Sequence, residues 1–199
     1  MFVWALLWII AAYLMGSLSS AIIVCRLGHY PDPRGEGSGN PGATNVLRIA
    51  GKGAAALTLL GDVLKGLIPM LISRYLFEQE WLWAATMLAA FAGHLYPVFF
   101  GFQGGKGVAT AFGAMLGASW LIGLAVLAGW LVVAWLSRIS SLSALLSAAL
   151  APLYMIFLAS WQSNWMPAAT AWLVVVLIWR HRDNIANIMA GSEKRIGKR

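Results

Sequence analysis

The residues best suited to chemistry lie in a polar stretch, residues 26–53, of a chain that is otherwise strongly apolar. Glycines in this stretch can turn backbone N–H groups toward an anion, because they have no side chain to keep the anion away. Other side chains add hydrogen bonds and positive charge, and these are Ser38, Asn40, Thr44, Asn45 and Arg48. The stretch therefore predicts a site for molecules that carry phosphate groups.

Two further segments have suitable chemistry. Residues 101–110 read GFQGGKGVAT and place Lys106 among glycines, just before an apolar run. Most loop lysines are merely solvated, but one that is flanked by glycines at the start of a helix is well placed to bind an anion. After the last apolar run, His181 and Asn184 begin a basic tail. We expect this tail to meet both glycine-rich segments on one side of a membrane, which favours a functional role for these two residues.

Several familiar sequence motifs are incomplete or lie in the wrong structural context in this sequence. Gly37, Gly39 and Gly42 match G-x-G-x-x-G, but an apolar run precedes them where a dinucleotide fold needs a strand. Lys106 is followed by Gly107, whereas a P-loop needs serine or threonine there. The three histidines have no H-E-x-x-H spacing and no cysteine partners, so we expect no metal site and no cofactor.

Composition indicates which elements must position these residues. Of 199 residues, 60% are hydrophobic and only 11% are charged, against about 25% charged residues in soluble domains. Uncharged runs of about 20 residues or more follow one another, which predicts an all-α integral membrane protein with one polytopic domain over residues 1–199. The net charge of +7 comes mostly from short loops and the tail, so it favours anionic lipids or substrates over nucleic acid as partners.

Charge placement predicts a bundle of seven helices, some of them short or half-crossing, with the N-terminus outside and the C-terminus in the cytoplasm. A single span over residues 108–137 would give six spans and leave the basic tail outside, against the positive-inside rule. A break near residues 117–119 gives seven, although the first piece is then too short for a full span. The predicted spans are 2–25, 54–73, 81–100, 107–118, 120–137, 139–160 and 165–180, and the predicted cytoplasmic segments are 26–53, 101–107 and 181–199.

Two charged residues, Asp62 and Lys65, lie inside a predicted span. They are three positions apart and therefore share a helix face. Charges within a membrane are costly and usually face the interior of the bundle. A structural ion pair and a link to the reaction site are both open interpretations of these residues.

Three segments together are specific enough to indicate a family. Residues 37–48 (GSGNPGATNVLR), 93–110 (GHLYPVFFGFQGGKGVAT) and 181–195 (HRDNIANIMAGSEKR) resemble the three motifs of the PlsY family. These are the membrane-embedded bacterial glycerol-3-phosphate acyltransferases that use acyl phosphate. The DVLKG segment at 62–66 is also similar to that family, and the likeness covers essentially the whole chain. The resemblance implies seven membrane helices, with all three motifs at the cytoplasmic face of the bacterial inner membrane.

The resemblance also implies a reaction. An acyl group would pass from acyl phosphate to the 1-hydroxyl of sn-glycerol 3-phosphate, which yields lysophosphatidic acid and inorganic phosphate for phospholipid biosynthesis. No histidine here is followed five positions later by aspartate, the acid–base dyad of many other glycerolipid acyltransferases. We therefore expect a phosphate oxygen of the substrate to accept the hydroxyl proton, with His181 as the alternative base. A soluble enzyme that makes acyl phosphate is an implied upstream partner.

By resemblance, the catalytic residues would be Ser38, Arg48, Lys106, His181 and Asn184. The residues expected to bind substrate phosphate are Gly39, Asn40, Thr44, Asn45, Gly104, Gly105, Gly107 and Thr110. The residues expected to support the structure are Asp62, Lys65, His94 and Glu193. A transporter of organic phosphates would use similar cations, but here the polar groups gather at one face and no series of charges crosses the bilayer.

Overall fold

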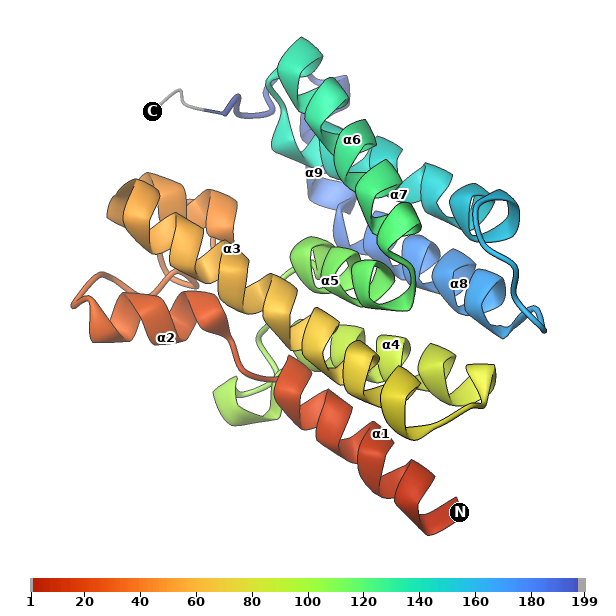
Figure 1. Cartoon of the computed structure of the whole chain (residues 1–199). Helices are drawn as coiled ribbons and strands as arrows, with labels where there is room; N and C mark the ends of the chain where they lie inside the picture. The colour runs from red at the N-terminus through yellow and green to blue at the C-terminus, as the bar shows by residue number, and fades with distance from the viewer. Residues whose placement is uncertain (1, 197–199) are drawn as a thin grey trace.

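Apolar runs of this kind form helices, because a helix satisfies all its backbone hydrogen bonds within one segment. The computed structural model describes residues 2–196, and no strand occurs among them. In chain order the helices are α1 (Phe2–Gly16), α2 (Ser20–Leu27), α3 (Ala43–Leu76), α4 (Glu80–Leu95), the 3-10 turn η1 (Val98–Phe100), α5 (Val108–Ala118), α6 (Trp120–Ser137), α7 (Ser140–Phe157), α8 (Trp165–Arg180) and α9 (Arg182–Met189) (Figure 1).

Helix length and hydropathy fit a membrane protein. In the described part, α3, Glu80–Phe100, α6 and α7 are each long and apolar enough to cross a membrane, and α1 with α2 can form a fifth span bent by 44°. The apolar helices α5 and α8 are shorter, with 11 and 16 residues. The all-helical membrane class is therefore confirmed, while the number of seven crossings and the sides of the two termini stay predictions.

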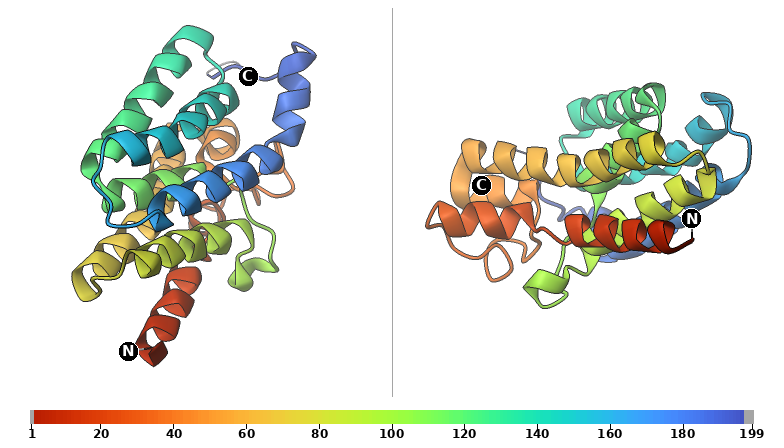
Figure 2. Two further views of the ribbon diagram at one scale, coloured as in Figure 1. Left: turned by 90° about the vertical axis from the view of Figure 1, so that its right-hand side faces the viewer. Right: turned by 60° about the horizontal axis from the view of Figure 1, so that its bottom comes forward.

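The first apolar run is broken rather than continuous over 2–25. Ser17 and Ser19 are buried at the break between α1 and α2, and both helices lie alongside α3 (Figure 2). A helix break frees backbone carbonyls that need new donors. Lys65 Nζ donates to the Leu18 carbonyl at 2.9 Å and lies 2.8 Å from Asp62 Oδ1. The ion pair therefore stabilises the bend.

The first polar stretch contains more helix than the predicted loop 26–53. α2 extends to Leu27, and α3 already begins at Ala43, so Thr44, Asn45 and Arg48 are helical. α3 continues through a kink at Gly51, whose φ of 83° and ψ of −175° form a conformation that essentially only glycine adopts. Gly51 therefore marks a kink rather than a loop, and the loop proper is residues 28–42.

Other helix ends also differ from the predicted segments. α4 ends at Leu95, before the buried Pro97, and not at residue 100. α7 ends at Phe157, whereas its span was predicted to reach residue 160. The predicted tail 181–199 contains α9 over Arg182–Met189, and residues 197–199 of that tail lie outside the described residues.

The short helix α5 is packed at the centre of the molecule, in contact with α3, α4 and α6 (Figure 1). A Cβ on Gly66 would overlap the Thr110 carbonyl, and one on Gly113 would overlap the Val63 carbonyl. Small residues at such positions let two membrane helices approach closely. This contact fixes the start of α5, and therefore Lys106 just before it, against α3.

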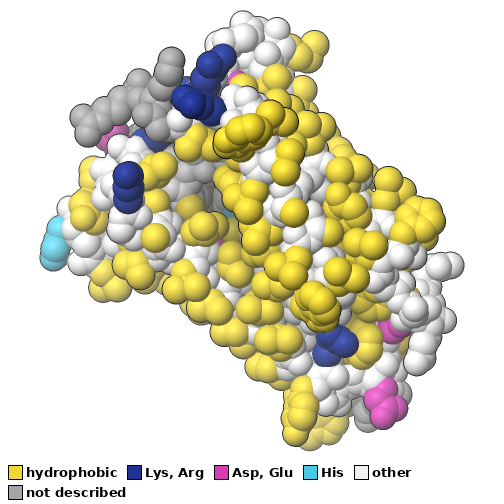
Figure 3. All heavy atoms as spheres, turned by 45° about the horizontal axis from the view of Figure 1, so that its top comes forward, with side chains coloured by type: hydrophobic (Ala, Val, Ile, Leu, Met, Phe, Trp, Pro, Cys, Tyr) yellow, Lys and Arg dark blue, Asp and Glu magenta, His cyan; other side chains and the backbone are white. Residues whose placement is uncertain are grey.

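The main core lies among α4, α5, α6, α7 and α8, and its fully buried side chains include Met87, Phe91, Met115, Ile122 and Leu173. Hydrophobic side chains also cover most of the face seen in Figure 3, as expected for a surface that contacts lipid. Most of the lysine and arginine side chains on that face gather at one end. The molecule therefore has an apolar body and a basic end.

Candidate active site

One cavity of about 660 Å³ brings the three polar segments together. The helices α3 to α9, the loop before α3 and the C-terminal residues contribute to its wall. All five residues predicted as catalytic line it, namely Ser38, Arg48, Lys106, His181 and Asn184. Other predicted residues in its wall are Asn40, Thr44, Asn45, Gly107, Asp62, His94 and Glu193.

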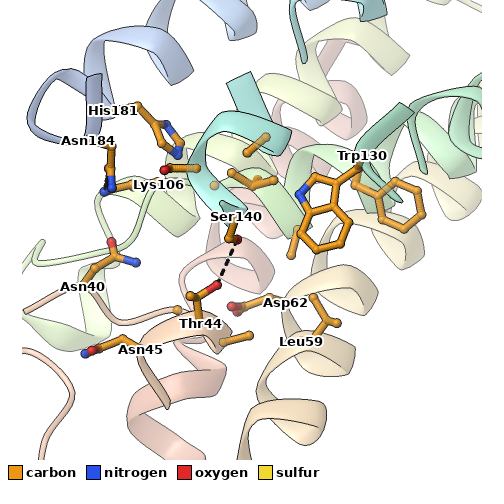
Figure 4. Close-up of a pocket in the computed structure, with 18 of the residues that line it drawn as sticks. Asn40, Thr44, Asn45, Leu59, Asp62, Lys106, Trp130, Ser140, His181 and Asn184 are labelled. Carbon is orange, nitrogen blue, oxygen red and sulfur yellow. Dashed lines mark hydrogen bonds between the residues drawn. The ribbon is translucent and has the colours of Figure 1, made fainter. Parts of the chain in front are cut away.

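The cavity has a polar end and an apolar arm (Figure 4). Lys106, His181 and Asn184 lie together at the polar end, with Asn40 close by. Leu59 and Trp130 lie on the opposite side of the view, and the wall of the apolar arm also contains Phe112, Met115, Val126 and Leu127. The cavity can therefore hold a molecule with one charged end and one hydrocarbon end.

A chain of hydrogen bonds orients Lys106. Its Nζ donates to Asn184 Oδ1, and Asn184 Nδ2 donates to Glu193 Oε1 at 2.7 Å. Ser141 Oγ donates to the same Glu193 oxygen at 2.6 Å. Partial burial lowers the pKa of Lys106, and the nearby Glu193 and Asp183 carboxylates oppose that effect. A partly buried ammonium group of this kind gains most from an anionic ligand.

His181 is buried at the end of α8 and is held as a neutral ring. Its Nδ1 lies 2.8 Å from the Leu177 carbonyl, which can only accept, so Nδ1 carries the proton and Nε2 keeps a free lone pair. Burial lowers the pKa of His181 to about 4; the Leu177 hydrogen bond opposes this effect and Lys106 adds to it. At pH 7 the Nε2 atom can therefore accept a hydrogen bond from a substrate.

Asn45 shapes the first loop. Its Oδ1 accepts from the Ser38 backbone N–H at 2.8 Å, and its Nδ2 donates to the Pro33 and Glu36 carbonyls at 2.9 Å each. These contacts occupy the amide, so Asn45 holds the loop in place. Ser38 and Arg48 are exposed and have no side-chain partner in the described part of the chain, which leaves both available to a ligand.

Gly104 and Gly105 of the second segment pack against neighbouring residues of the protein. Gly104 and Gly105 do not line the cavity; a Cβ on Gly105 would clash with the His94 ring, and its N–H donates to the His94 carbonyl at 3.2 Å. Arg180 Nη2 donates to their two carbonyls at 3.2 and 2.9 Å. Gly107, with φ of 84°, then turns the chain into α5. These contacts hold the segment that carries Lys106 in place.

Two other predicted phosphate ligands also lie outside the cavity wall. Gly39 has φ of 69° in the first loop and does not line the cavity. Thr110 is fully buried, donates from Oγ1 to the Asp62 carbonyl at 3.0 Å, and lies 3.0 Å from His94 Nδ1. Thr110 therefore joins α5 to α3 and α4.

The cavity wall contains polar residues that the sequence did not single out, namely Ser140, Ser141, Ser147, Asn187, Ser192 and Lys194. Ser140 and Ser141 begin α7, and Ser140 Oγ lies 3.2 Å from Thr44 Oγ1. The sequence does place two serines after Arg138 at the start of an apolar run, and this pattern could have indicated a polar helix start at the site. Because α3, α5 and α7 all begin at the cavity, three helix N-termini present partial positive charge there.

Comparison with known proteins identifies the family. The family model for glycerol-3-phosphate acyltransferase matches residues 6–191 of this chain. The chain belongs to the glycerol-3-phosphate acyltransferase family. It is 56% identical over 192 residues to the glycerol-3-phosphate acyltransferase of Thioalkalivibrio sulfidiphilus, with 96% of this chain and 93% of that protein covered. It is 55% identical over 187 residues to that of Methylococcus capsulatus, with 94% and 93% covered.

Solved structures of an integral membrane glycerol 3-phosphate acyltransferase, PlsY, have the same fold as this chain. The glycerol 3-phosphate form has a TM-score of 0.91 and 40% identity, and covers 97% of this chain and 96% of that one. The lysophosphatidic acid form has a TM-score of 0.89 and 37% identity, with 97% and 95% covered. The family resemblance of the three segments is thereby confirmed, and this acyltransferase is an integral membrane enzyme.

Proposed function

We propose that this acyltransferase moves an acyl group from acyl phosphate to the 1-hydroxyl of sn-glycerol 3-phosphate, and releases lysophosphatidic acid and inorganic phosphate. The observation that supports this most directly is the single cavity that joins Lys106, His181 and Asn184 to an apolar arm lined by Phe112 and Trp130. The polar end can bind the phosphate groups of both substrates, and the apolar arm can hold the acyl chain.

Electrostatics favour two phosphate-bearing substrates at the polar end. Arg48 and Lys106 both line the cavity, and three helix N-termini add partial positive charge. Cations and N–H groups fixed in a partly dry site stabilise negative charge far better than they would in water. These groups would also stabilise the oxyanion that forms when the hydroxyl attacks the acyl carbonyl.

The proton of the attacking hydroxyl passes, in our proposal, to a phosphate oxygen of a substrate. The bond from the hydroxyl oxygen to the acyl carbon forms, the bond from that carbon to the phosphate oxygen breaks, and the phosphate leaves with the electron pair. His181 Nε2 and the Asn184 amide orient the substrates by hydrogen bonds, because burial keeps His181 neutral and the Leu177 contact keeps its proton on Nδ1. Acyl phosphate is already activated, so the reaction needs no metal.

The acyl chain lies, in this proposal, along the apolar arm between α3, α5 and α6. Relative to water, burial of each methylene group contributes about 0.8 kcal/mol, which favours a long chain. The basic end would face the cytoplasm of the bacterial inner membrane, in line with the positive-inside rule. A soluble enzyme that makes acyl phosphate would then deliver the donor from that side.

The deciding experiment compares donors on the purified protein in detergent. With labelled glycerol 3-phosphate, we expect lysophosphatidic acid to form from a long-chain acyl phosphate and much more slowly from acyl-CoA. Product formation without a sealed compartment also separates this function from transport of organic phosphates. Failure with acyl phosphate, or equal rates with both donors, would overturn the proposed donor.

The same assay tests the absence of a metal. We expect turnover to stay unchanged in excess chelator. A loss of activity that Mg²⁺ restores would show that the reaction needs a metal ion in addition to the cations of the polar end.

A further inference from the structure

The C-terminal strap, residues 190–196, forms part of the polar wall of the cavity. α9 ends in a Schellman motif: Gly191, with φ of 68°, donates its N–H to the Ile188 carbonyl at 3.1 Å, and Ser192 N–H donates to the Asn187 carbonyl at 2.8 Å. This motif turns the chain back after α9. The strap residues Ser192, Glu193, Lys194 and Ile196 consequently line the cavity.

Hydrogen bonds hold the strap on both sides of Lys194. Before it, Glu193 Oε1 accepts from Ser141 Oγ at 2.6 Å and from Asn184 Nδ2 at 2.7 Å. After it, Ile196 N–H donates to the Arg138 carbonyl at 2.7 Å. Lys194 is therefore placed at the cavity by contacts to α7, α9 and the turn before α7, unlike a lysine in a freely solvated tail.

The negative charge of the proposed substrates favours a further cation, such as Lys194, at the polar end of the cavity. Two phosphate groups carry about three to four negative charges near pH 7. Of the predicted site residues that line the cavity, only Arg48 and Lys106 bring full positive charge. Asp62 is already paired with Lys65, and Glu193 adds a negative charge. A third cation at the wall would bring the charges closer to balance.

We propose that Lys194 is a third phosphate-binding cation of this site, contacting a phosphate group of glycerol 3-phosphate or of acyl phosphate. The inference rests on the proposed function. On this proposal the strap positions two binding residues, because the Glu193 contacts that orient Asn184 also fix the position of Lys194. The exposed Lys194 side chain keeps its charge free for the ligand, since no described residue pairs with it.

The test is Lys194→Gln, with Arg195→Gln as the matched control, because Arg195 is adjacent and exposed but does not line the cavity. KM is measured separately for each substrate with purified full-length enzyme. Loss of one charge-assisted hydrogen bond should raise KM for one substrate about tenfold, with little change in kcat. The substrate whose KM rises identifies the phosphate that Lys194 contacts, and Lys194→Arg should restore most of the affinity.

Every outcome decides the inference. KM values like those of Arg195→Gln would overturn it, and so would a loss of kcat at unchanged KM, which would indicate a disturbed Glu193 contact instead. Wild-type enzyme in the same assay separates the two proposals. If it makes no lysophosphatidic acid from acyl phosphate, the proposed function fails; if it does and Lys194→Gln is normal, only this inference fails.

Discussion

His181 tests the proton transfer at the level of one residue. If a substrate phosphate oxygen is the base, His181→Gln should keep substantial activity, about a tenth or more, because glutamine can still offer a hydrogen bond to the substrate. The pH dependence of kcat/KM should keep its shape. A collapse of activity together with loss of the acid limb would instead identify His181 as the general base.

The burial of His181 also predicts a pH-dependent stability. Its pKa is lowered from the ordinary 6.5 to about 4 in the folded protein, so the unfolded chain takes up a proton at a higher pH than the folded one. The stabilising contribution is fully present above pH 6.5 and is lost as pH falls toward 4. It amounts to roughly 3 kcal/mol, because each pKa unit corresponds to about 1.4 kcal/mol.

Thermal unfolding in detergent measures this effect. The difference in midpoint between wild type and His181→Gln should shrink as pH falls from 6.5 to 4, because only the wild type contains a neutral ring that must be protonated. A difference that is constant across this range would contradict the assignment of a buried neutral His181.

At the level of elements, the contact between α3 and α5 fixes the position of Lys106. Gly113→Ala would place a methyl group on the Val63 carbonyl, and we expect a loss of about 1–3 kcal/mol in unfolding free energy from overpacking. Gly53→Ala, in α3 with no atom within 4 Å of the added Cβ, is the control and should be neutral or slightly stabilising. Equal unfolding midpoints for the two variants would argue against a tight α3–α5 contact.

The apolar arm predicts a residue that sets chain-length preference. Trp130 lines the arm on α6, so Trp130→Ala should enlarge it and raise kcat/KM for long acyl chains relative to short ones by at least about threefold. Trp135→Ala is the control, because Trp135 lies on the same helix, is 79% exposed and does not line the cavity. An identical preference in both variants would place the acyl chain elsewhere.

At the level of the whole molecule, the sequence anticipated much of the architecture. The apolar runs predicted an all-α membrane protein, and the position of the basic tail predicted a break within residues 108–137, which the structure has at Ser119 in extended conformation. Local patterns suffice for such features because hydrophobicity and charge act along the chain. The family resemblance, and not these patterns, grouped Ser38, Lys106 and His181, and they line one cavity.

Features that depend on tertiary contacts were not predictable in this way. Gly104 and Gly105 suggested a phosphate cradle, yet they pack against His94. A glycine in a sequence indicates that some group approaches the backbone closely, but it does not indicate which group. Ser141 looked like an ordinary first-turn residue of an apolar helix, and its contact with Glu193 spans 52 positions of sequence. Lys194 looked like one more tail cation until the Schellman motif at Gly191 placed it at the cavity.

The central claim is that one cavity transfers an acyl group from acyl phosphate to glycerol 3-phosphate. The most direct measurement follows inorganic phosphate released from a long-chain acyl phosphate by the purified protein in detergent, together with lysophosphatidic acid. We predict equal amounts of both products, strict dependence on added glycerol 3-phosphate, and a loss of at least about a hundredfold in Lys106→Met. Phosphate release without glycerol 3-phosphate, or turnover that Lys106→Met leaves intact, would contradict the account.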